Sequence, residues 1–141
     1  MTGILRAASP DDADAVIALW RACGLTRPWN DPLADFERAI AFAGSTVLVI
    51  EDAGAIIGSA MAGFDGHRGW LYYVGIAPDR QGEGHARRLV EAACDFLRAQ
   101  GCPKAELMVR DGNPAQGLYE RLDWDLQPVR VWARWLNEKD D

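Results

Sequence analysis

The stretch Asp79–Val90, which reads DRQGEGHARRLV, carries residue types that could bind a phosphate. Gly82 and Gly84 stand two apart, directly before an apolar helical pattern. Glycine can adopt a positive φ and lets a ligand approach the backbone. The N-terminus of the following helix offers unpaired N–H groups and a partial positive charge. The stretch therefore predicts either a phosphate or pyrophosphate site or a plain turn before a helix.

Two common nucleotide-binding loops fit this stretch poorly. A Walker loop requires GxxxxGK followed by Ser or Thr, and the stretch has neither the lysine nor the hydroxyl residue. A dinucleotide fingerprint requires GxGxxG, but Arg87 stands in the place of the third glycine. The stretch also does not lie in the first strand–helix unit of the chain.

The elements that must position this loop alternate between strand and helix patterns. Strands are predicted at Ile4–Ala8, Thr46–Glu51, Ala55–Phe64, Trp70–Ala77 and Ala105–Val109, with one or two more within Leu126–Trp135. Helices are predicted from the Ser9 cap to Gly24, from the Asp31 cap through Ile40, over His85–Leu97 and over Asn113–Leu122. This order predicts a mixed α/β sheet in a single domain over residues 1–141.

Composition narrows the class of protein. The chain has 141 residues and a net charge of −6, which argues against general nucleic-acid binding. The longest apolar stretch, AIIGSAMAGF, is far too short to span a membrane, and the N-terminus has no signal-peptide pattern. The three cysteines show no metal-ligand spacing, which predicts reduced thiols and no metal site. We therefore expect a cytoplasmic protein without a membrane partner.

Gln81, Gly84 and Ala86 match the Q/R-x-x-G-x-G/A signature of the GCN5-related N-acetyltransferases, the GNAT family. YYVGIAPDRQGEGHARRLVEAACDFLRAQG resembles the central motif of that family, and NPAQGLYERLDW resembles its later Asn…Tyr-x-x-x-G-[FW] motif. The order of elements resembles the family fold over essentially the whole chain. RPWNDP, FDGHRG and GCPK further resemble the bacterial YpeA-type branch.

The resemblance implies a single-domain GNAT-like fold: a mixed central sheet, flanked by helices, with a splayed pair of parallel strands. It implies acetyl-CoA as acyl donor. The pantetheine arm would pair with the backbone of the strand before the loop, and the pyrophosphate would lie on the loop amides. In this sequence the implied cofactor-binding residues are Val74, Gly75, Ile76, Gln81, Gly82, Glu83, Gly84, His85, Ala86, Arg87, Asn113 and Tyr119. Glu83 can occupy an anion site if its side chain points to water.

The implied catalytic residues are Tyr119 and Tyr72. Tyr119 aligns with the family tyrosine that protonates the departing thiolate, and a phenol is protonated at neutral pH; otherwise it is a core aromatic residue. Many relatives place a glutamate base where Tyr72 stands, so a water chain or a backbone carbonyl could take the proton instead. Asp65, His67 and Glu106 are further candidates for the base. Asn113 either contacts the cofactor or caps the short helix.

Acceptor recognition in this family falls to the loop between the first two helices and to strands near the thioester. The implied substrate-binding residues are Trp29, Asn30, Asp65, His67 and Tyr72. The acceptor would be a primary amine on a small molecule, peptide or protein, attacked directly. A non-catalytic acyl-CoA sensor and a flavodoxin-like phosphate binder are the alternatives. The resemblance also allows a homodimer.

One residue departs from the later family motif. Asp123 stands where the family usually has glycine, just before Trp124. Aspartate tolerates the left-handed backbone conformation better than most residues, so we expect the helix to end there all the same.

Overall fold

The computed structural model describes residues 3–137, and these fall into two compact units that divide after Leu107. The first unit contains a five-stranded sheet whose strands follow chain order. Its strands are β1 (Ile4–Ala7), β2 (Ser45–Asp52), β3 (Ala55–Phe64), β4 (Gly69–Ile76) and β5 (Ala105–Glu106). Its α-helices are α1 (Ala13–Ala22), α2 (Pro32–Ala41) and α3 (His85–Ala99), with short 3-10 turns at Pro10–Asp12 and Pro78–Arg80.

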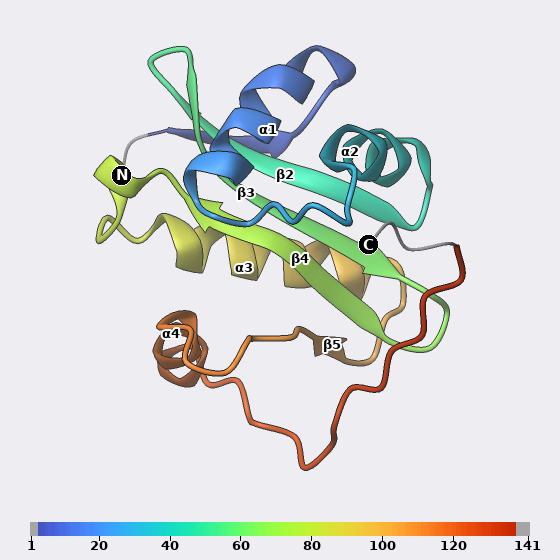
Figure 1. Ribbon diagram of the computed structural model, residues 1–141. Coiled ribbons are helices and arrows are strands. Elements are labelled where there is room, and N and C mark those ends of the chain that lie inside the picture. Colours follow the sequence, from blue (N-terminus) through green and yellow to red (C-terminus); the bar gives the residue numbers. More distant parts are fainter. Residues whose placement is uncertain (1–2, 138–141) are drawn as a thin grey trace. The chain divides into compact units, whose positions relative to one another are not determined.

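The sheet is mixed, as the sequence predicts. Strands β1 to β4 pair antiparallel, whereas β4 and β5 run parallel (Figure 1). The parallel pairing covers only Gly69 opposite Ala105 and Trp70 opposite Glu106, and β4 then continues to Ile76 paired with β3 but not with β5. This geometry confirms the expected splayed pair of parallel strands. No strand among residues 3–137 pairs with the outer side of the later part of β4, which we call the open edge of the sheet.

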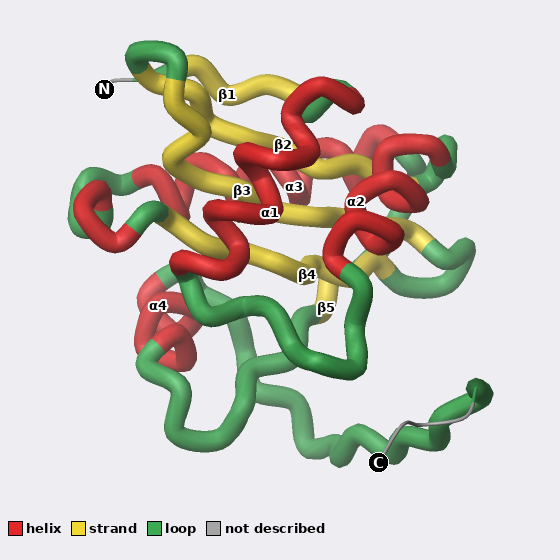
Figure 2. Tube along the Cα trace, turned by 45° about the horizontal axis from the view of Figure 1, so that its top comes forward, coloured by secondary structure: helices red, strands yellow, loops and turns green. Residues whose placement is uncertain are grey.

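Helices cover both faces of this sheet. Figures 1 and 2 show α1 and α2 on one face and α3 on the other. On the first face, the fully buried Trp20 and Phe36 pack with Val47 and Val49 of β2. On the second face, α3 buries Leu89 and Leu97. Burial on both faces explains the continuous apolar run in β2, which the sequence marks as a strand.

The helix starts follow their capping residues. Asp31 caps α2, because its Oδ1 accepts a hydrogen bond of 3.2 Å from the Ala34 N–H, and Pro32 occupies the first turn. Ser9 precedes a 3-10 turn, and its N–H donates to the Asp12 carboxylate at 2.8 Å. The Asp31 cap is confirmed at the start of α2, whereas Ser9 caps the 3-10 turn Pro10–Asp12 and α1 follows that turn at Ala13.

The second unit contains helix α4 (Ala115–Arg121). The strands predicted within Leu126–Trp135 are wrong: these residues form no strand, and Leu126 and Trp132 are exposed. A strand needs a partner whose backbone bonds to it, and the described part of this unit offers no second strand. β5 is likewise shorter than the predicted Ala105–Val109. The single domain over residues 1–141 stays a prediction.

Candidate active site

The loop after β4 has the backbone that a phosphate site requires. Gly82 has a φ of 81° and Gly84 a φ of 85°, so both adopt the left-handed conformation expected of them. A Cβ added at Gly82 would meet no atom within 4 Å, so this side of the loop is open to a ligand. Gly84 is the N-cap of α3, and the first-turn amides of His85, Ala86 and Arg87 have no acceptor one turn earlier. These features fit a bound pyrophosphate.

Charged side chains hold this loop in place. Arg80 bridges Asp52 on β2, at 2.7 Å, and Glu83 within the loop, at 3.1 Å. Glu83 also contacts Nε2 of the buried His85 at 2.8 Å. Hydrogen bonds from His85 and then Arg80 lower the pKa of Glu83. The Glu83 carboxylate therefore has two partners within the loop, while its side chain remains 43% exposed to solvent.

The open edge of β4 joins this loop at Ile76. The Ile76 carbonyl accepts hydrogen bonds from Gln81 Nε2 and from Cys23 Sγ, each at 3.3 Å. Gly75 lies against Cys23 and Leu25, because a Cβ there would fall within about 3 Å of both side chains. The structure thus brings together two of the predicted groups, namely the strand residues from Val74 to Ile76 and the loop residues from Gln81 to Arg87.

A β-bulge interrupts β4 directly before this edge. Tyr72 pairs with Met61 and Gly75 with Ser59, so the register shifts by one residue between them. Tyr73 has a φ of 52°, a conformation that residues other than glycine rarely adopt. Sequence reasoning missed this bulge. Its one local trace in the sequence is Ser59, a polar residue in an otherwise apolar strand, and this does not by itself indicate a bulge.

The remaining strand candidates lie around the β3–β4 hairpin. Tyr72 is 43% exposed, and burial, followed by the charge of Asp65, raises its pKa. Asp65 Oδ1 accepts from the backbone N–H groups of His67 and Arg68, each at 2.8 Å, and these bonds lower its pKa. Glu106 pairs with Arg68 at 3.6 Å. Asp65 and Glu106 are therefore engaged in local structure, which weakens both as candidates for the base.

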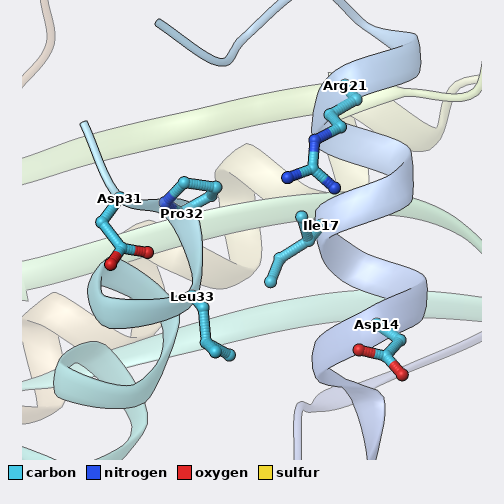
Figure 3. Close-up of a pocket in the computed structure, with 6 residues that line it drawn as sticks. All are labelled: Asp14, Ile17, Arg21, Asp31, Pro32 and Leu33. Carbon is cyan, nitrogen blue, oxygen red and sulfur yellow. The ribbon is translucent and has the colours of Figure 1, made fainter. Parts of the chain in front are cut away.

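The loop between α1 and α2 borders a groove. Trp29 is about half exposed, and the Arg27 side chain folds back onto the carbonyls of Gly24 and Thr26. The groove has a volume of about 410 Å³, and Figure 3 shows Arg21 and Ile17 pointing from α1 toward α2. Its lining consists of Asp14, Ile17, Arg21, Asp31, Pro32 and Leu33. The predicted acceptor loop thus reaches the groove through the cap residue Asp31.

The second unit contains the other two predicted site residues. Asn113 Oδ1 accepts from the Ala115 N–H at 2.8 Å, which confirms its role at the start of α4. Burial raises the pKa of Tyr119 to about 12, and its ring meets Trp124 edge to face at 5.8 Å. Asp123 has a φ of 65°, as expected of a residue in the place of a glycine. Tyr119 is therefore firmly protonated at neutral pH.

A parallel strand pair that separates beside a glycine loop at a helix N-terminus is an arrangement suited to an extended ligand that carries phosphates. Comparison with known proteins identifies the family. Residues 13–124 match the Acetyltransferase (GNAT) family, and the chain belongs to that family. An acetyltransferase of Yersinia enterocolitica is 47% identical over 133 residues, which cover 94% of each chain. One of Pectobacterium atrosepticum is 49% identical over 116 residues, or 82% of each chain.

Solved structures agree on the fold. The aminoglycoside N-acetyltransferase AAC(6')-Iy, solved with a bisubstrate analogue of CoA, superposes with a TM-score of 0.82 at 17% identity over 96% of this chain and 99% of that one. An acetyltransferase of Clostridium acetobutylicum, solved with acetyl-CoA, gives 0.80 at 13% identity over 94% and 96% of the two chains. Together with the family model and the named relatives, this identifies the chain as an acetyl-CoA-dependent acyltransferase of the GNAT family.

Two further findings concern only residues 3–137. No helix there is long and apolar enough to cross a membrane. No group of three or more His, Cys, Asp or Glu side chains there is arranged to hold a metal ion.

Proposed function

We propose that this protein transfers the acetyl group of acetyl-CoA to a primary amine, by direct attack of the amine on the thioester. The observation that carries the proposal is the continuity between the open β4 edge and the glycine loop. Val74, Gly75 and Ile76 can pair with the pantetheine arm as an added strand. The amides from Gln81 to Arg87 can bind the pyrophosphate at the N-terminus of α3.

The proposed chemistry uses the β4 edge and, from the second unit, Tyr119. The amine nitrogen attacks the carbonyl carbon, and a β4 amide beside the bulge donates to the oxygen as negative charge develops there. The carbon–sulfur bond then breaks. The Tyr119 hydroxyl gives its proton to the leaving thiolate, while the new ammonium loses one to a water chain or a backbone carbonyl. Asn113 is proposed as a further contact to the cofactor.

We propose that the acceptor contacts Trp29 and Asn30 on the α1–α2 loop and Tyr72, Asp65 and His67 near the thioester. The half-exposed indole of Trp29 supports this placement, because an aromatic face attracts cations. The proposed acceptor is an amine of a small molecule or a peptide, and the proposal involves neither nucleic acid nor a membrane. We propose a homodimer as the active form.

A non-catalytic acyl-CoA sensor is the second candidate, because Tyr72 occupies the place of the usual glutamate base. The test is release of free thiol from acetyl-CoA with a panel of amines, run beside calorimetric binding of CoA. Amine-dependent thiol release supports the enzyme. Tight CoA binding with no acylated amine across small amines, polyamines, peptides and protein lysines supports the sensor. No response to CoA would refute both.

A further inference from the structure

The bulge in β4 changes which face its side chains occupy. Before the bulge, Gly69 faces α3, since a Cβ there would meet Leu97. After the bulge, Tyr73 stacks on Trp20 of α1, and Gly75 faces Cys23 beyond the end of α1. Odd-numbered residues thus switch from one face of the sheet to the other. A one-residue insertion of this kind re-aims the backbone groups that follow it.

A buried chain of contacts holds the bulge. Ser59 Oγ donates to the Tyr73 carbonyl at 2.9 Å and accepts from Trp20 Nε1 at 2.9 Å. The rings of Trp20 and Tyr73 stack with centroids 3.8 Å apart and planes 9° apart. The Tyr73 hydroxyl donates to Asp35 Oδ2 of α2 at 2.7 Å. Residues of α1, α2 and β3 therefore all contact Tyr73 of β4.

The contacts around Tyr73 include buried hydrogen bonds, which apolar packing alone would not require. Ser59 and Trp20 are fully buried, and each polar group has its partner in the other or in Tyr73. Buried polar groups fix a conformation, because any other arrangement leaves them without partners. A non-glycine residue at positive φ persists only when its surroundings over-determine it. Here Ser59 and Trp20 restrain Tyr73, through a hydrogen bond to its carbonyl and a stacking contact with its ring.

We propose that Ser59, Trp20 and Asp35 are positioning residues that hold the Tyr73 bulge, so that the next β4 amides face the developing oxyanion. None of the three needs to touch the substrate. The proposal rests on the proposed function for its catalytic consequence. Its structural half, that Ser59 sets the backbone geometry at Val74 and Gly75, stands independently.

The test uses Ser59→Ala with Ser45→Ala as matched control. The Ser45 hydroxyl also donates to a backbone carbonyl, that of Ala39, at 2.8 Å, but Ser45 pairs with Gly63 at the other end of β3. Tyr73→Phe is the second variant, because it keeps the stacked ring and removes only the bond to Asp35. It serves alone if Ser59→Ala does not fold.

The first readout is the amide signals of Val74 and Gly75 in proton–nitrogen NMR spectra of the free protein. We expect them to move in Ser59→Ala and in Tyr73→Phe and to stay in place in Ser45→Ala. Unmoved signals in the two bulge variants, or an equal shift in the control, would overturn the proposal. This result does not depend on any activity.

The second readout separates positioning from folding. A misplaced oxyanion donor lowers kcat, so we expect about a tenfold loss in Ser59→Ala and a smaller loss in Tyr73→Phe. The Kd for CoA should stay within about twofold, because the loop amides are untouched. Equal losses in kcat and CoA affinity would instead indicate general loosening and refute positioning. If the wild type turns over no amine, the proposed function fails, and the NMR result still decides the structural half.

Discussion

Replacement of Gly84 by aspartate and by asparagine isolates the charge that the loop is proposed to bind. Gly84 is the N-cap of α3 and has a φ of 85°. Any other residue at such a φ costs about 1 to 2 kcal/mol, and Asn and Asp carry this cost best. The two variants share shape and backbone strain, so both should lose similar thermal stability. They differ only by one negative charge.

The size of the charge effect follows from Coulomb's law. A carboxylate about 5 Å from a pyrophosphate charge, at an effective dielectric of about 20, is repelled by about 3 kcal/mol. That energy corresponds to about a hundredfold weaker binding of CoA by Gly84→Asp than by Gly84→Asn. Salt screens exposed charges over about 10 Å at 0.1 M. The gap between the two variants should therefore narrow as salt is added.

Isothermal calorimetry of CoA binding at low and at high salt measures this gap, and thermal melts of both variants check that the folds are equally stable. Dephospho-CoA, which keeps the pyrophosphate and lacks the ribose phosphate, should show the same gap. Equal affinities of the two variants for CoA would refute the placement of the pyrophosphate at this loop, whatever the activity of the wild type.

Three further predictions concern other sites. Tyr119→Phe should lower turnover strongly while CoA affinity stays normal. Because burial raises the Tyr119 pKa to about 12, the ratio of wild-type to variant rates should stay constant from pH 7 to about 10. A ratio that halves near pH 10 would contradict the assignment. The Arg6 guanidinium holds the pKa of Asp12 well below its usual range, so its contribution to stability is present above about pH 4, the usual pKa of aspartate, and is lost as the pH falls further. Urea unfolding should therefore show Asp12→Asn less stable by about 1 kcal/mol at pH 7 and the difference shrinking toward pH 2; a growing difference would reverse the argument. Asp31→Ala removes the cap on the Ala34 N–H and should cost about 1 kcal/mol in thermal unfolding, whereas Asp31→Asn should cost little; equal losses would show that the cap is not the cause.

Local signals in the sequence account for most of the fold. The caps at Ser9 and Asp31, the helical stripe of α3 and the β-branched run of β2 each act within a few residues, so their pattern is sufficient to place the element. Leu126–Trp135 shows the opposite case. Its alternation of polar and apolar residues satisfies the strand pattern, yet strand formation depends on a second segment that no local pattern specifies.

The same division applies to the site. The glycine loop was predictable because positive φ and a helix N-terminus follow from residue type and order. The bulge at Tyr73 was not predictable, because it arises from long-range contacts. Tyr73 contacts Ser59, which is 14 positions earlier in the chain, and Trp20, which is 53 positions earlier. The contact of Glu83 with His85 was not predicted for a related reason, because His85 lies close in sequence but its burial depends on the packing of α3.

Donor and acceptor recognition therefore differ in how far sequence can specify them. The donor is proposed to bind backbone amides, so its site needs only glycines, an open strand and a helix start, and these leave a recognisable pattern. The acceptor is proposed to bind side chains that come from the α1–α2 loop and the β3–β4 hairpin, two segments with no common motif. The contacts that hold the bulge connect the proposed acceptor side with the proposed donor side. Asp35 lies one turn after the cap residue Asp31 on α2, and its carboxylate accepts a hydrogen bond from Tyr73, the bulge residue of β4. A substitution at Asp35 is therefore expected to alter catalysis through Tyr73, although Asp35 is not proposed to contact either substrate.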